Sequence, residues 1–211
     1  MRTNSKKYSF SFTTCSLRPQ DSIKIAEAYV KNRDWDVVRH LVVGENLLQQ
    51  RTTRSLERLY QELSSRLKCL TQDEIIYFVN APDPRKRLIL WIAVCRRYDF
   101  IHEFAVEIIR ENCFKLDFQL DDLDFVAFFT SKLSLHAELN SISATTKGKA
   151  RQVIFRMLRE AGLMDRNNNI AQDSVSIYAF DRTVQQPNTT VQILMKSDTK
   201  QLSGIYQEAS I

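Results

Sequence analysis

The sequence RKRLILWIAVCRRY, residues 85–98, is the part of the chain that decides the fold. Between Leu88 and Cys95 it is apolar without a break, so a helix formed here carries apolar side chains on every face. Such a helix is stable in water only when other elements surround it. The run is far shorter than the roughly 20 residues that cross a bilayer, so it predicts a buried central helix and no membrane span.

Helical periodicity continues in both directions from this central helix. Asp21 and Asp99 are expected N-caps, a helix is expected to start at Asp34, and Thr71 with Glu74 has the spacing of a capping box. The caps and the apolar spacing together predict a mainly helical protein. The expected helices cover about residues 21–31, 34–44, 53–69, 71–78, 85–98, 99–109, 121–139 and 145–163.

We expect an all-α, compact multi-helix globular fold with helix-turn-helix-like elements and a short irregular or β-like C-terminal tail. Pro82 and Pro84 interrupt the helices. Residues 1–80 are expected to form an N-terminal helical bundle with a helix-turn-helix-like element. Residues 81–211 are expected to hold the central buried helices and a winged-helix-like segment, packed with the first part as one unit. Residues 173–196 lose the helical period and suggest short β-like pieces.

Composition excludes several classes of protein. The chain of 211 residues has only 4 glycines and contains neither GxGxxG nor GxxxxGK[ST], so a nucleotide-driven machine is not expected. Its N-terminus lacks the continuous apolar stretch of a secretory signal. The four cysteines are far apart and are expected to be free thiols rather than disulfides. A cytoplasmic location follows from these features.

No pattern of catalytic or metal-binding residues stands out. His102 and Glu103 begin like the HExxH motif of zinc proteases, but Val106 occupies the position of the second ligand. The acidic residues Asp121 and Asp122 fit the first turn of a helix better than a metal site. We therefore expect no enzymatic activity, no cofactor, no metal and no small-molecule substrate.

The charge distribution points to a polyanionic partner. The net charge is +5, and it divides into +6 over residues 1–70, −4 over 71–140 and +3 over 141–211. Two basic ends therefore flank an acidic middle. Nucleic acid is a partner that fits such an asymmetry, although an ordinary solvated surface also accounts for it.

The helix expected at residues 145–163 has the strongest functional pattern. Lys149, Gln152, Arg156 and Arg159 are spaced at i, i+3, i+7 and i+10, which places them on one stripe. Five basic residues and no acidic one occur between Thr145 and Arg159. A long basic helix followed by short strands is typical of a winged helix-turn-helix, whose helix enters the major groove. The opposite face should be buried, through Ala150, Val153, Ile154, Met157, Leu158 and Ala161.

The first turn of the same helix contains Thr145, Thr146 and Lys147. Hydroxyl groups, free backbone N–H groups and the helix dipole all favour a phosphate at such a position. A solvated basic face without a ligand remains the alternative. It accounts less well for charge of one sign, because solvated helices usually mix Glu with Lys.

The helix expected at residues 53–69 shows a weaker version of the pattern. Arg51, Arg54 and Arg58 lie opposite its apolar stripe and form a second basic line. Glu62 stands four residues after Arg58 and can pair with it, as it can with Arg66. Contact with a nucleic acid and a solvated surface therefore both stay open for this line.

Four segments of the chain resemble the BrxA family, a small core protein of bacterial BREX (bacteriophage exclusion) phage-defence systems. They are YSFSFTTCSLRPQDSIKIAEAYVKNRDWD (8–36), NLLQQRTTRSLERLYQELSSRLKCL (46–70), LILWIAVCRRYDFIHEFAVEII (88–109) and TTKGKARQVIFRMLREAGLM (145–164). The resemblance covers about residues 8–165. It rests on the four segments taken together rather than on one motif. It implies an all-α protein without enzymatic activity that binds double-stranded DNA through helix-turn-helix elements, beside other BREX proteins.

Pattern and resemblance together predict a non-catalytic protein that binds double-stranded DNA. Lys147, Lys149, Arg156 and Arg159 are expected to contact phosphates, and Gln152 a base edge. Arg51, Arg54 and Arg58 would form a second line along the DNA backbone. The alternative is a protein–protein adaptor whose basic faces dock acidic surfaces of other BREX subunits.

Overall fold

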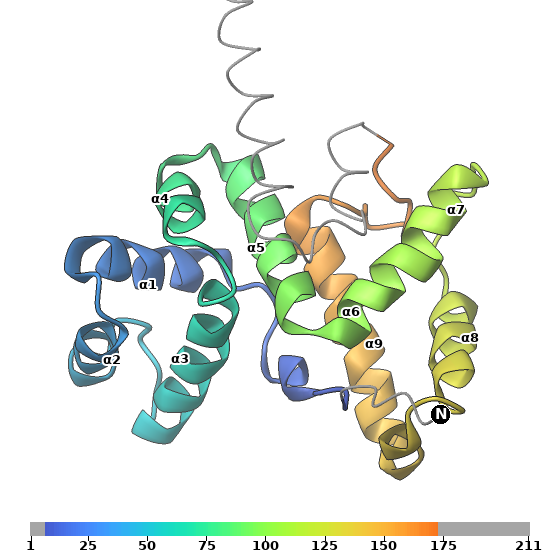
Figure 1. Ribbon diagram of the computed structural model, residues 1–211, viewed down its shortest axis with the longest axis horizontal. Helices are drawn as coiled ribbons and strands as arrows, with labels where there is room; N and C mark the ends of the chain where they lie inside the picture. The colour runs from blue at the N-terminus through green and yellow to red at the C-terminus, as the bar shows by residue number, and fades with distance from the viewer. Residues whose placement is uncertain (1–6, 173–211) are drawn as a thin grey trace, which may run out of the picture.

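Helix α5, Asp83–Arg97, is the buried central helix that the sequence predicts. Every residue from Leu88 to Cys95 is buried. Helix α3 (Thr53–Leu67) and helix α9 (Ala144–Ala161) both pack against it, and it runs between the two halves of the molecule in Figure 1. A single cluster of buried side chains extends across both halves. The core is therefore shared by the two parts of the chain.

The computed structural model describes residues 7–172, which are all-α. The tail pieces expected at residues 173–196 lie outside the described residues. Within residues 7–172 no helix is both long and apolar enough to cross a membrane, and all four cysteines are free thiols. The remaining elements are η1 (Ser11–Thr14), α1 (Pro19–Asn32), α2 (Trp35–Gly44), α4 (Gln72–Asn80), α6 (Asp99–Phe104), η2 (Ala105–Arg110), α7 (Glu111–Phe114), α8 (Asp122–Lys132) and η3 (Ala137–Ser141).

Helices α1, α2 and α3 contact one another pairwise and form the N-terminal bundle. Asp34 stands at the start of α2, as predicted, and it is the N-cap, because its carboxylate accepts hydrogen bonds from the backbone N–H groups of Asp36 and Val37. The capping box of Thr71 and Glu74 is also present at the start of α4. Asp21, however, is not an N-cap. Helix α1 begins at Pro19, which suits a first turn because it lacks an N–H group, and Asp21 pairs with Arg18 at 2.6 Å.

The second half is built on one long helix interrupted by a π-helical segment, η2, between α6 and α7. Asp99 is the first residue of α6 and not its N-cap, contrary to the prediction; the N-cap is Tyr98. Helix α8 ends at Lys132, short of the expected residue 139. There the Lys132 ammonium donates to Glu103 and Glu107, at 2.6 and 2.7 Å.

Helix α9 ends where Gly162 adopts a left-handed conformation with φ of 76°. Gly162→Ala is expected to lower the free energy of unfolding by about 1 kcal/mol, because a Cβ atom disfavours this conformation. Gly148 is the matched control, since it lies inside the same helix and, like Gly162, has open space around the added Cβ. Gly148→Ala should raise the free energy of unfolding by about 0.5–1 kcal/mol. Urea denaturation measures both; changes of the same sign would contradict the helix end described.

Candidate nucleic-acid interface

The exposed face of α9 carries the predicted stripe. Lys149, Gln152, Arg156 and Arg159 are all exposed. On the other face Ala150, Ile154, Met157, Leu158 and Ala161 are buried, whereas Val153 is half-buried. The local helix geometry thus separates the polar stripe from the core as the spacing predicts.

The charged residues of this stripe differ in whether another side chain pairs with them. Arg156 Nε donates to Glu160 at 2.8 Å, and the other carboxylate oxygen of Glu160 accepts from the Leu17 backbone N–H at 2.8 Å. Arg159 donates to the Asn168 side chain at 2.6 Å. Lys149 makes no hydrogen bond or ion pair with another residue in 7–172. Lys149 is therefore the uncompensated cation of the stripe.

The first turn of α9 is already partly occupied. Ser143 is its N-cap, accepting from the Thr146 backbone N–H at 3.1 Å, and its hydroxyl lies 2.9 Å from that of Thr146. The Lys147 ammonium lies over the ring of Phe129, 4.5 Å from its centre. Thr145 is exposed. Sequence reasoning missed Ser143, although its position two residues before Thr145 fits the preference for Ser at N-caps.

A short hairpin follows α9 directly. Met164 and Ile170 form an antiparallel bridge, and Asn169 forms another with Gln119, just before α8. The Asp165 carboxylate closes the turn, and hydrogen bonds from the side chain and backbone of Asn169 hold its pKa below the usual range. The order from α6 onward is therefore helix, bridge segment, α8, α9, hairpin. The α8–α9 connection, residues 133–143, is longer than the three or four residues of a simple helix-turn-helix.

A pocket of about 360 Å³ lies between α9 and this hairpin. On its α8 side, Arg151 forms an ion pair with Asp122. Gln152 is thus placed beside a depression rather than on a flat surface. The lining residues are Asp122, Arg151, Gln152, Phe155, Arg156, Arg159 and Asn168.

The second basic line, on and before α3, is also exposed at Arg51, Arg54 and Arg58. The pairing of Arg58 with Glu62, which the sequence allows, does not form. Glu62 is buried and accepts instead from Arg66, at 2.9 and 3.1 Å, and from the Tyr98 hydroxyl. Arg58 consequently has no ion-pair or hydrogen-bond partner in the described part of the chain. This leaves the second line more strongly basic than its sequence suggests.

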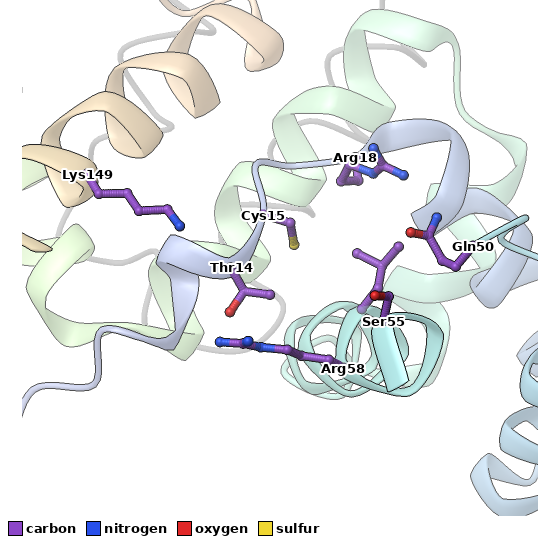
Figure 2. Close-up of a pocket in the computed structure, with 8 residues that line it drawn as sticks. Thr14, Cys15, Arg18, Gln50, Ser55, Arg58 and Lys149 are labelled. Carbon is purple, nitrogen blue, oxygen red and sulfur yellow. The ribbon is translucent and has the colours of Figure 1, made fainter. Parts of the chain in front are cut away.

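One residue of each basic line, Arg58 and Lys149, lines a pocket of about 310 Å³ (Figure 2). Helix η1 packs against both α3 and α9 and separates them. Arg58 reaches the pocket from α3, and Lys149 reaches it from α9 (Figure 2). Sequence reasoning did not point to the η1 residues that line it. The lining residues are Thr14, Cys15, Arg18, Gln50, Ser55, Arg58, Leu59 and Lys149.

This geometry defines an all-α protein with two basic helices that flank one pocket. The chain belongs to the BrxA family, because the BrxA family model matches residues 6–180. A relative, the BREX protein BrxA of Escherichia coli O9:H4 (strain HS), is 22% identical over 149 residues, which are 71% of this chain and 70% of that protein. A crystal structure of an uncharacterized protein from Magnetospirillum magneticum shares the fold, with a TM-score of 0.68 and 17% identity over 93% of this chain and 95% of that one.

Proposed function

We propose that this protein is a cytoplasmic, non-catalytic double-stranded DNA-binding component of a BREX phage-defence system. The observation that carries the proposal is that one cation from each basic helix, Arg58 of α3 and Lys149 of α9, lines the same pocket. Within the described residues, Arg58 and Lys149 have no carboxylate to neutralise them, so they are available to an anionic partner. Membership of the BrxA family and the name of the Escherichia coli relative support the place in a BREX system.

The order of elements around α9 supports the winged-helix reading. Helix α9 is followed by a hairpin, and Gln119 before α8 bridges to that hairpin. In winged-helix proteins this arrangement presents the helix to the major groove. Arg156, Arg159 and Lys149 would then contact phosphates, and Gln152 would face the base edges.

The competing proposal is a protein–protein adaptor, in which the same basic faces dock acidic surfaces of other BREX subunits. The high density of uncompensated positive charge also fits this role. The two proposals differ in what the charged residues do. On the DNA proposal they control duplex affinity and its salt dependence, and on the adaptor proposal they control co-purification with a partner subunit.

The test is fluorescence anisotropy of the purified protein on a labelled random duplex from low to physiological salt. If about four to six phosphates are neutralised, log K falls against log salt with a slope of about −4 to −5. Absence of binding at low salt would reject duplex binding and leave the adaptor. Magnesium-dependent cleavage of the duplex during the assay would reject the non-catalytic part of the proposal.

A further inference from the structure

The pocket between η1, α3 and α9 is positively charged and has no carboxylate in its lining. Three cations line it, and one of them, Arg18, is paired with Asp21 at 2.6 Å. The other two, Arg58 and Lys149, are unpaired within residues 7–172. Two unpaired like charges that face one hollow repel each other, and an anion bound between them removes that repulsion.

The remaining lining groups suit a phosphate. Thr14 and Ser55 present hydroxyl groups, which donate well to phosphate oxygens. In Figure 2, Thr14 lies directly above the guanidinium of Arg58, on the side of the pocket that faces Lys149. Burial raises the pKa of the Cys15 thiol, so this side chain is neutral at physiological pH and does not repel an anion. The pocket therefore offers cations and donors without a competing negative charge.

The wall of the pocket formed by η1 is fixed in place. Arg66, which is buried, donates to the backbone carbonyl groups of Cys15 and Ser16 at 3.0 and 2.6 Å. Its own charge is balanced by Glu62 at 2.9 Å. Donors held in advance by such contacts bind a ligand without losing further conformational freedom.

We propose that this pocket holds a phosphate group of a nucleic-acid strand, so that the basic lines of α3 and α9 grip the same duplex through it. The inference rests on the proposed DNA-binding function and adds a site to it. At about 310 Å³ the pocket is at the lower end of ligand sites, which suits one phosphate and its adjoining sugar. It makes Thr14 and Ser55 contact residues alongside Arg58 and Lys149.

A double-mutant cycle tests whether Arg58 and Lys149 hold the same phosphate. Arg58→Ala and Lys149→Ala are each expected to weaken duplex binding about 10-fold, and the double variant about 30-fold rather than 100-fold. The control cycle uses Arg54→Ala and Arg156→Ala, on the same two helices but outside the pocket lining, and its effects should multiply. Multiplying effects in the Arg58 and Lys149 cycle as well would overturn the shared phosphate.

Alkylation of Cys15 at a saturating concentration of duplex supplies a second readout, which reports whether the pocket is occupied rather than how tightly the duplex binds. In a Cys69→Ser background, Cys15 is the one remaining cysteine of residues 7–172 that is partly exposed, because Cys95 and Cys113 are buried. Duplex DNA should slow its reaction with a maleimide at least about threefold, and the Arg58→Ala, Lys149→Ala double variant should lose this protection. Duplex binding without protection would overturn the pocket and leave the proposed function standing.

Pyrophosphate distinguishes a pocket that holds a phosphate of a nucleic-acid strand from one that holds a free phosphate ligand. It should also protect Cys15 at millimolar concentration, since it carries the same phosphate chemistry without the strand. Protection by pyrophosphate in a protein that binds no duplex would overturn both the strand contact and the proposed function. The pocket would then take its phosphate from a free ligand.

Discussion

Reversing the charge of Lys149 and Arg156 together is expected to weaken duplex binding by at least about 100-fold at low salt. A nonspecific dissociation constant of about 10 µM lies about five powers of ten below the 1 M standard state. If about five phosphate contacts contribute equally to this affinity, each one accounts for about 10-fold. Loss of two contacts accounts for about 100-fold, and repulsion by the new carboxylates adds to it. Anisotropy with Lys149→Glu, Arg156→Glu measures the effect, and the salt slope should become shallower by about 2.

The control is Lys31→Glu with Lys115→Glu, which changes the net charge by the same amount at exposed positions outside both basic lines. It should weaken binding by less than about 10-fold. Lys149→Glu alone is expected to cost more affinity than Arg156→Glu alone, because Arg156 is already paired with Glu160. An unchanged affinity in the double variant, with loss of co-purifying BREX subunits, would favour the adaptor.

Arg96→Ala is expected to lower the free energy of unfolding by about 3–5 kcal/mol. Arg96 lies on the central helix and donates to both carboxylate oxygens of Glu74, at 2.6 and 3.0 Å. The two side chains are only 4% and 3% exposed, so the substitution removes the Arg96 guanidinium from a buried carboxylate. Chemical denaturation followed by circular dichroism gives the value.

Arg87→Ala is the matched control on the same helix. Arg87 also pairs with a carboxylate, that of Asp83 at 3.4 Å, but their side chains are 47% and 63% exposed. Water screens this pair, and its loss should change the free energy of unfolding by no more than about 0.5 kcal/mol. Similar values for the two variants would mean that the Glu74–Arg96 pair is not held in the interior.

Several helix features were predictable from local chemistry alone, although the N-caps expected at Asp21 and Asp99 were wrong. The helix start at Asp34, the capping box at Thr71 and the apolar run from Leu88 to Cys95 need no distant contact, and all three predictions are confirmed. The end of α8 at Lys132 was not predictable. At this end Lys132 pairs with Glu103 and Glu107, which the fold brings to it from another helix. Periodicity cannot register a partner that is distant in sequence.

The same distinction holds for the candidate site. The stripe on α9 follows from the spacing of Lys149, Gln152, Arg156 and Arg159 within one helix, and the structure places these four on its exposed face. The pocket depends instead on Thr14, a residue of η1 that meets α3 and α9 only in the folded chain. Whether DNA occupies either place stays a prediction.

If the proposed function holds, the central helix α5 also constrains the shape of the DNA that can bind. Because α3 and α9 both pack against a helix whose middle is entirely buried, neither can shift without opening the shared core. The distance between the two basic lines is therefore a fixed property of the protein. A duplex that touches both has to match this distance with its own groove width or curvature. Base steps that deform easily would then be preferred at positions that no side chain touches.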